Sequence, residues 1–546
     1  MRNFLISIVF SLGVFASSCS QIGADLIVHN ARVYTVDDAF TQAESFAVKD
    51  GKILEVGPSD VIMNKYRSDH LMDMNGMFVY PGLIDAHCHF YGYGMSLNNA
   101  DLVGTTSFDE IIEILQEHHK QFPSEWILGR GWDQNDWEKK EFPTRDQLDA
   151  VFPDVPVYLR RIDGHGAIAN TEALERAGIT DETTVEGGQL IKEDGRLTGV
   201  LIDNAMGLVG RMIPGPTHND IITGLLKAQE NCFAVGLTAV HDAGLSKELI
   251  EIMDSLHHTR AFKMRVNAMM SPSQENFETF LDNGIYETDR LTVRSVKLFA
   301  DGALGSRGAL MIEPYSDDPG NHGLLVTAPD HLREICQRAY DAGYQINTHC
   351  IGDSANRLML HIYADILRGT NDRRWRIEHA QIVHPADFSL FGEYSIIPSI
   401  QTTHATSDMY WAIDRVGPER IKGAYAYKKL MDQNGWIPNG SDFPVEHINP
   451  LYGFYAAVAR KDHAGYPEGG FQMEDALSHE EALRAMTIWA AKAGFNEHHY
   501  GSLEPGKFAD FIVMTEDIMT CDIDLVPDLK IYKTFIQGEE VYSAKN

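Results

Sequence analysis

The sequence predicts an α/β protein built around a (β/α)8 barrel. Three observations carry this prediction. The middle of the chain alternates strand-like and helix-like patterns, both ends contain short strand-like runs, and one connection in the middle is far too long for a simple barrel. The chain has 546 residues, which is more than one compact domain needs, so two or three structural units are expected.

Eight apolar stretches in the middle of the chain have the length and composition of buried strands. The segments between them carry apolar residues at three- and four-residue spacing, as in residues 331–343, which is typical of helices that cover a sheet. Strands and helices in alternation imply parallel β/α units, and eight such units fit a barrel. The predicted strands are residues 78–90, 236–244, 261–270, 291–301, 344–353, 374–383, 394–403 and 436–445.

The two ends of the chain resemble each other and differ from the middle. Residues 22–80 contain short alternating runs with turns, and the turn at residues 49–52 joins two of them as a hairpin. Residues 496–546 repeat this style. We therefore expect one small sheet domain built from both termini, around a barrel that spans residues 81–495.

The first two barrel strands are separated by about 145 residues, whereas a β/α unit needs about 30. This excess predicts an inserted subdomain within residues 100–230. The segment has strand-like runs and helix-like runs of its own, so the insertion is expected to be α/β.

The net charge excludes one class of partner. The chain has 46 basic and 78 acidic residues, and 46 − 78 = −32. Such a charge repels phosphates, so we expect no nucleic-acid partner. The acidic residues are interpreted as a solvated surface.

The first nineteen residues form a separate unit. Arg2 precedes an apolar run that is too short to span a membrane but fits the core of a signal peptide. Residues 16–19 resemble a bacterial lipobox, in which Cys19 becomes the lipidated first residue. This predicts an exported lipoprotein that faces the periplasm and meets the membrane only through its lipid. Without lipidation of Cys19 the protein would be secreted, and the number of chains in the assembly stays open, a homo-oligomer included.

Metal-ligand residue types stand at the carboxyl ends of five predicted strands. In a barrel these ends meet on one face, where active sites lie. A single histidine of this kind is often a core residue, but several on one face favour a shared site. The residues are His87, His89, Lys297, His349, His379 and Asp442.

Three of these residues, His87, His89 and Lys297, have specific chemical properties that suit a metal site. His87 and His89 alternate with Cys88 on one strand, so both imidazoles point to the same side. A lysine ammonium does not bind metals, but Lys297 carboxylated by CO₂ becomes a carbamate that bridges two of them. The alternative is a lysine paired with a neighbouring acid such as Asp301.

A set of four histidines, one lysine and one aspartate can hold one or two divalent metal ions, and zinc suits it best. The pKa of a bound water would fall from about 15.7 to about 7, and the hydroxide would attack a carbonyl. Asp442 would then act as general base and later protonate the departing nitrogen, although an aspartate in Gly-Ser-Asp can also be a helix cap. The pattern therefore predicts a metal-dependent hydrolase.

Eight strings, in order along the chain, resemble the amidohydrolase superfamily, in the branch of N-substituted formamide deformylases and exoenzyme-regulation-type amidohydrolases. They are PGLIDAHCHF, GRGWDQNDW, RIDGHGAIANTEAL, KLFADGALGSRGA, THCIGDSAN, RIEHAQ, NGSDFPVE and GSLEPGKFADFIV. The resemblance covers about residues 25–540.

This resemblance implies a distorted TIM barrel and a composite β-sandwich made of residues 22–80 and 496–546. It also implies hydrolysis of C–N bonds in small-molecule amides. By position, the six residues named above correspond to the metal site of the family. His165, in the string DGH, and Arg307, in GSRGA, correspond to substrate-side residues.

The function expected from residues and resemblance together is hydrolysis of an N-acyl or N-formyl amine. Two alternatives stay open. One is a mononuclear deaminase, although such enzymes carry a glutamate shortly after the fifth-strand histidine; here His349 is followed by no Glu, and Asp353 would have to replace it. The other is a non-catalytic binding lipoprotein on a retained barrel.

Overall fold

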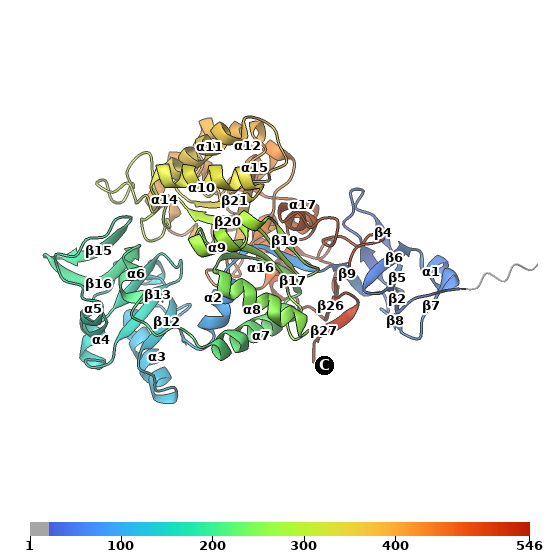
Figure 1. Ribbon diagram of the computed structural model, residues 1–546, viewed down its shortest axis with the longest axis horizontal. Helices are drawn as coiled ribbons and strands as arrows, with labels where there is room; N and C mark the ends of the chain where they lie inside the picture. Colours follow the sequence, from blue (N-terminus) through green and yellow to red (C-terminus); the bar gives the residue numbers. More distant parts are fainter. Residues whose placement is uncertain (1–20, 546) are drawn as a thin grey trace, which may run out of the picture.

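A computed structural model describes residues 21–545 of the chain. The predicted signal peptide, residues 1–19 with its lipobox at Cys19, lies outside the described residues. Figure 1 shows three parts in a row: a sheet domain at the left, a barrel with its helices in the middle, and a small sheet domain at the right. No helix within residues 21–545 combines the length and apolar character that crossing a membrane requires.

The central part is a barrel of parallel strands, which confirms the predicted fold class. Each predicted strand is present, and each pairs in parallel with the next along the chain. A short strand, β19 (Tyr286–Glu287), adds to the edge of the fourth barrel strand in antiparallel register. The barrel strands are β10 (Leu83–Cys88), β17 (Leu237–Leu245), β18 (Arg265–Met270), β20 (Leu291–Phe299), β21 (Gln345–Cys350), β22 (Arg376–His379), β23 (Ile397–Gln401) and β24 (Asn439–Gly440).

The last strand returns to the first and closes the barrel next to the predicted site. The backbone N–H of Asp442 donates to the carbonyl of His87 over 2.7 Å, and that of His89 donates to the carbonyl of Phe443 over 2.8 Å. Gly440 permits this approach, since a Cβ there would lie 2.4 Å from the backbone nitrogen of His87. The closure places the end of β24 directly beside the end of β10.

Helices cover the outside of the barrel as the apolar spacing predicts. In α10 (Pro329–Ala342), Leu332, Ile335 and Ala339 are buried on one face. Pro329 begins the helix and Gly343 ends it with a positive φ of 79°. Other helices around the barrel include α2 (Phe90–Ser96), α7 (His218–Ala234), α8 (Lys247–His258), α11 (Asp353–Leu367), α12 (Phe388–Glu393), α13 (Thr402–Asp408), α15 (Tyr427–Asn434), α16 (Pro450–Ala459) and α17 (His479–Ala485).

The long connection between β10 and β17 holds a separate α/β unit with its own six-stranded sheet (Figure 1). Its strand order is β11-β12-β13-β14-β16-β15, parallel at one end and antiparallel at the other. The unit ends earlier than residue 230, because α7 packs against α2 and β17 of the barrel. Its strands are β11 (Ala100–Asp101), β12 (Ile127–Trp132), β13 (Val157–Arg161), β14 (Gly166–Ala169), β15 (Gly188–Glu193) and β16 (Arg196–Asp203), with helices α3 (Phe108–Gln121), α4 (Asp146–Val151), α5 (Thr171–Arg176) and α6 (Met206–Gly210).

Both ends of the chain contribute to the small domain at the right of Figure 1. One sheet has the order β6-β5-β2-β8 and the other β27-β26-β25-β9-β3-β4. Phe46 of the first sheet meets Phe511 of the second edge-on at 5.1 Å between ring centroids, and Phe511 stacks on Phe535 at 4.3 Å. These strands are β2 (Leu26–His29), β3 (Arg32–Tyr34), β4 (Gln42–Ala43), β5 (Ser45–Lys49), β6 (Lys52–Gly57), β8 (Leu71–Asp73), β9 (Phe78–Pro81), β25 (Phe511–Met514), β26 (Lys533–Ile536) and β27 (Glu539–Ser543).

Candidate metal centre

Three of the predicted ligands meet where β10 and β24 end. Asp442 Oδ1 lies 3.3 Å from His89 Nε2 and 3.5 Å from His87 Nε2. The side chain of His87 is completely buried, and that of Asp442 is nearly so. The three donor atoms lie within 4.8 Å of one another, which is close enough for one cation to contact all of them.

Asp442 also faces a second group of histidines. His379, at the end of β22, and His404, in α13, form a further set of donors with Asp442 within 4.8 Å. His349, at the end of β21, stacks edge-on against His379 at 4.5 Å between ring centroids. Its Nε2 is turned toward the carbonyl of Gly302 at 3.4 Å, so His349 adjoins these groups of donors without belonging to them.

Lys297 projects from β20 into the same site. Its Nζ lies 3.2 Å from His87 Nε2, and the side chain is fully buried. It makes no ion pair with Asp301, whose carboxylate instead accepts backbone N–H groups of Ile351 and Gly352. Burial lowers the pKa of Lys297 to about 8, although nearby carboxylates act to raise it.

The charge states of the histidines fit metal binding at some positions and not at others. Burial holds the pKa of His87, His349 and His379 below the usual range, so these rings are neutral near pH 7, which is the form that ligates metals. Burial would lower the pKa of His404 too, but hydrogen bonds to Asp442 and Glu446 raise it to about 10. Proximity alone would allow His404 as a ligand, whereas its charge makes it an ion-pair partner of Asp442, with Nε2 3.6 Å from Oδ2.

Asp442 has the properties of a cation ligand. Burial acts to raise its pKa, but the surrounding histidines hold that pKa well below the usual range, so the carboxylate is ionised. Its Oδ1 has no hydrogen-bond partner within residues 21–545 although it is buried. Asp442 and His379 both adopt positive φ angles, 63° and 71°, a strained conformation for non-glycine residues that recurs at functional sites. The donor set therefore fits a divalent metal.

A layer of acceptors behind the histidines orients the rings. Glu378 Oε2 lies 2.6 Å from His87 Nδ1, and Gln401 Oε1 lies 2.7 Å from His379 Nδ1. When Nδ1–H donates to these acceptors, Nε2 carries the lone pair that a metal needs. Glu378 is fully buried, and its neighbours, His87 first, hold its pKa down to about 2 against the effect of burial.

His165 reaches the site from the inserted unit. Its ring stacks near that of His349 at 4.8 Å between centroids, and its Nδ1 lies 2.7 Å from Asp203 Oδ1. Burial would lower the pKa of His165, but Asp203 and then Asp163 raise it. The structure thus brings His165 beside the predicted ligands, as a histidine that can carry a proton.

Arg307 lies elsewhere. Its guanidinium donates to the carboxylate of Asp317 over 2.9 and 3.3 Å, and Arg307 is not among the residues that line the cavity at the metal centre. Asp317 is shared with Arg415. The backbone of Arg307 has a φ of 60°, in a turn whose earlier residues Leu304 and Gly305 line that cavity. Arg307 is therefore placed in a charge cluster of the loop after β20, and its role as a substrate-side residue stays a prediction.

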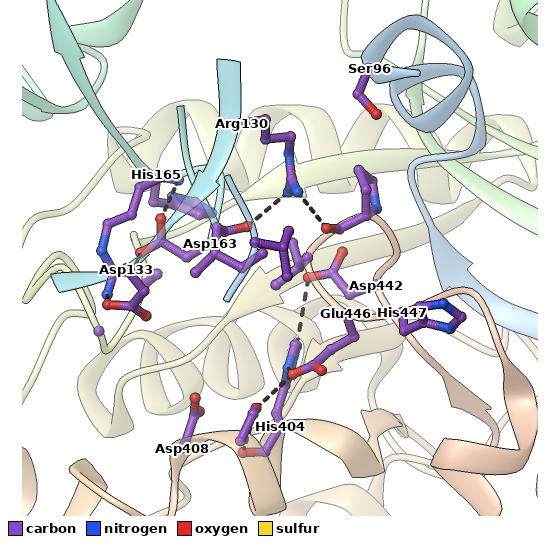
Figure 2. Close-up of a pocket in the computed structure, with 18 of the residues that line it drawn as sticks. Ser96, Arg130, Asp133, Asp163, His165, His404, Asp408, Asp442, Glu446 and His447 are labelled. Carbon is purple, nitrogen blue, oxygen red and sulfur yellow. Dashed lines mark hydrogen bonds and ion pairs between the residues drawn. The ribbon is translucent and has the colours of Figure 1, made fainter. Parts of the chain in front are cut away.

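A cavity of about 590 Å³ opens on Asp442, His165 and His404. In Figure 2, His404 points up toward Asp442, while Arg130 and Asp163 lie on the opposite side of the carboxylate. Of the tryptophans in the chain, Trp411 contributes to the wall. The wall includes the apolar side chains of Leu97, Val103, Leu304, Trp411 and Ile448 and the acidic side chains of Asp136, Asp408 and Glu446.

Sequence reasoning missed His404 and Glu378. His404 follows β23 by three residues, so the rule that active residues stand at carboxyl ends of strands would have found it on the seventh strand. Glu378 stands in β22 between Ile377 and His379, and a charged residue inside a buried strand was its only signal.

Comparisons with known proteins agree with this geometry. Residues 70–542 match the model of the amidohydrolase family. The chain is 34% identical to Protein LONG AFTER FAR-RED 3 of Arabidopsis thaliana, over 95% of this chain and 92% of the relative. It is 26% identical to an N-substituted formamide deformylase of Arthrobacter pascens, over 94% and 97% of the two chains. A crystal structure of an uncharacterized metal-dependent hydrolase from Pyrococcus horikoshii superposes with a TM-score of 0.74 at 28% identity, covering 91% of this chain and 99% of the other.

The deaminase alternative finds less support. A 5-methylthioadenosine/S-adenosylhomocysteine deaminase of Syntrophobacter fumaroxidans matches 20% of this chain at 32% identity. Asp353, which would have to replace the missing glutamate, accepts the backbone N–H of Ile312 over 2.8 Å and does not line the cavity.

Proposed function

Because this chain belongs to the amidohydrolase family, we propose that it hydrolyses the C–N bond of an N-acyl or N-formyl amine at the centre around Asp442. The class is a metal-dependent hydrolase acting on C–N bonds. The proposal of an N-acyl or N-formyl amine as substrate rests on the buried, ionised Asp442. This residue lies between His87 and His89 on one side and His404 on the other. We propose His87, His89, Lys297, His349, His379 and Asp442 as the metal site.

A divalent metal held by these donors, zinc by their chemistry, would polarise the amide carbonyl and lower the pKa of a water to about 7. Asp442 supplies the base. Its carboxylate accepts the proton of the attacking water and returns that proton to the departing nitrogen. His404 Nε2 forms an ion pair with the other oxygen of Asp442, 3.6 Å away, and so favours an orientation of the carboxylate toward the site.

Lys297 is proposed to carry a carbamate. The reaction with CO₂ needs the neutral amine, and a pKa of about 8 makes that form available near neutral pH. The amine nitrogen bonds to the carbon of CO₂ and loses one proton. Since His87 Nε2 lies 3.2 Å from Lys297 Nζ, the resulting anion would lie beside His87. Its oxygens would be donors for a second metal.

His165 is proposed to stabilise the carbonyl oxygen of the substrate. Asp203 accepts from Nδ1 and favours the protonated ring, which leaves Nε2–H as a donor. Charge that develops on the carbonyl oxygen during attack would be stabilised by this donor. The inserted unit thereby contributes a residue to chemistry at the barrel.

The setting of the enzyme is also a proposal. We infer an exported lipoprotein that faces the periplasm, attached through Cys19, with small-molecule amides rather than nucleic acid as partners; a homo-oligomer is compatible with this. The apolar run before Cys19 and the net charge of −32 support it. Labelling of expressing cells with a palmitate analogue should mark the wild-type chain, and a Cys19→Ser variant that is labelled equally would contradict it.

The proposed function is tested by metal content and activity together. Purified chain should contain one or two zinc ions by elemental analysis and should cleave members of a panel of N-formyl and N-acetyl amines. Removal of metal by a chelator should abolish turnover, and added zinc should restore it. Activity that is indifferent to the chelator would contradict the proposal, as would bound metal without hydrolysis of any amide in the panel. In that second case the non-catalytic binding alternative would be favoured.

A further inference from the structure

A second cavity, of about 960 Å³, adjoins the metal centre on the side of His89. It shares Arg130, Asp163 and His165 with the smaller cavity. A substrate whose scissile bond lies at Asp442 therefore has room for a substituent on each side. The two cavities differ in the charges that they present.

Two arginines stand together on the wall of the larger cavity. Arg130 in β12 and Arg160 in β13 are direct partners in the parallel register of the inserted sheet. Because partners in register project to the same face, both side chains reach the same space, and both line the cavity. Arg130 in addition lines the smaller cavity, close to the reaction site, and Figure 2 shows it pointing down between Asp163 and Asp442.

Within residues 21–545, neither Arg130 nor Arg160 forms an ion pair with a carboxylate, in contrast to the neighbouring Arg161. Arg130 donates instead to the backbone carbonyls of Ile162, over 2.8 Å, and Pro444. Burial, followed by the positive charge of Arg160, lowers the pKa of Arg130 to about 10, which leaves it cationic at neutral pH. In a chain with 78 acidic and 46 basic residues, a pair of arginines without acidic partners stands out.

The acidic residues of this cavity are all engaged by other groups. Asp163 pairs with Arg161 at 2.6 Å, and Asp203 pairs with His165 at 2.7 Å. The remaining two, Asp220 and Asp242, accept hydrogen bonds from Thr217 at the start of α7 and from the backbone of Tyr91. None of these four carboxylates pairs with Arg130 or Arg160, so the two guanidinium groups remain available to an anionic ligand in the larger cavity.

We propose that the larger cavity binds a carboxylate carried by the amide substrate, with Arg130 and Arg160 as its ligands. This rests on the proposed function and narrows it to N-acyl compounds that also bear a carboxylate, such as N-acyl amino acids. Arginine presents paired N–H groups that match the two oxygens of a carboxylate, and such charge-assisted bonds are stronger than neutral ones. The fixed carbonyl contacts of Arg130 hold one of the two guanidinium groups in place before a ligand arrives.

Two probes that differ only by the carboxylate test this inference: N-acetylphenylalanine, as both enantiomers, and N-acetylphenethylamine. Binding is measured calorimetrically to the zinc-loaded Asp442→Asn variant, so that turnover does not interfere. We expect N-acetylphenylalanine to bind about 10- to 100-fold more tightly than the neutral probe. Arg160→Gln in this background should remove most of that difference, and Arg160→Lys should remove part of it.

Arg211→Gln is the matched control, since Arg211 follows α6 near the same unit but lines neither cavity. It should leave both affinities unchanged. Equal affinities for the two probes, an equal loss of both in Arg160→Gln, or no binding of N-acetylphenylalanine would overturn the carboxylate site. Hydrolysis of the probes by the wild-type chain is measured separately. Selective, Arg160-dependent binding without cleavage of either probe would keep the carboxylate site and count against the proposed function.

Discussion

Glu378 Oε2 lies 2.6 Å from His87 Nδ1, and both side chains are completely buried. The two residues are 291 positions apart in the chain, and the barrel brings strands β10 and β22 together around them. A carboxylate behind a histidine fixes the tautomer and raises the basicity of the nitrogen that faces the metal. Glu378 is in this sense a positioning residue for the metal centre.

Glu378→Gln should weaken zinc binding about 10- to 100-fold, because the amide no longer holds His87 by a charged hydrogen bond. Competition with a chromophoric chelator measures this affinity. Glu393→Gln, an exposed glutamate at the end of α12, is the control and should bind zinc as the wild type does. Wild-type affinity in Glu378→Gln would show that the 2.6 Å contact does not support the metal.

Asp442→Asn should lower kcat by about 10²- to 10⁴-fold, since the amide cannot accept the proton of water. Elemental analysis should still find metal, because the four histidines and Lys297 of the proposed site remain. The same variant separates the enzyme from a binding lipoprotein, which would have no turnover to lose and would keep its ligand. Unchanged kcat with full metal content would contradict the role of Asp442.

Lys297→Ala should reduce the metal content from two ions to one if a carbamate bridges the pair. The loss of one Lewis acid is worth about 3 kcal/mol, so activity should fall about 100-fold. Added short carboxylates, which can occupy the space of the carbamate, should restore part of it. Two ions per chain in Lys297→Ala would rule out the carbamate bridge.

His165→Ala should lower kcat by about 10²- to 10³-fold while changing KM much less, because the donor acts on charge that develops during the reaction. Asp203→Asn, which removes the charge behind His165 but keeps its shape, should lower kcat by a smaller factor. Steady-state kinetics on one N-acyl amine measure both effects. An increase in KM alone would instead assign His165 to ground-state binding.

The buried His257 on α8 should make the free energy of unfolding depend on pH, independently of the metal. Burial lowers its pKa from the ordinary 6.5 to about 4, against the opposing hydrogen bond to the carbonyl of Met264. The unfolded chain therefore binds the proton more tightly, so this contribution is complete above about pH 6.5 and is lost as the pH falls toward 4. This contribution of His257 to the free energy of unfolding is about 3 kcal/mol.

Urea unfolding of the wild type and His257→Gln at a series of pH values measures this contribution. The difference between the two chains should shrink as the pH falls from about 6.5 to about 4. His258→Gln, at the exposed neighbour, should follow the wild type at each pH. A parallel pH dependence of wild type and His257→Gln would assign the acid sensitivity to other groups.

Several features of the fold follow from local patterns alone. Apolar runs with turn residues between them mark each barrel strand, and their alternation with amphipathic stretches makes the sheet parallel. The hairpin at residues 49–52 forms as expected, with Lys49 opposite Lys52. The end of the inserted unit was harder to place, because α7 has the same amphipathic pattern whether it covers the insertion or the barrel. Its contacts with α2 and β17 assign α7 to the barrel and not to the inserted unit.

The barrel and the residue types at the carboxyl ends of its strands could be predicted from the sequence, because the periods of strands and helices and their alternation are local patterns. Which side chains touch one another became known from the three-dimensional structure. The structure adds His404 and Glu378 to the residues around the predicted site and pairs Arg307 with Asp317. It also places Arg130 beside Arg160, and neither of the two forms an ion pair with a carboxylate of the described residues. Such contacts depend on closure of the barrel and on side-chain directions, and these are settled by packing between segments hundreds of residues apart.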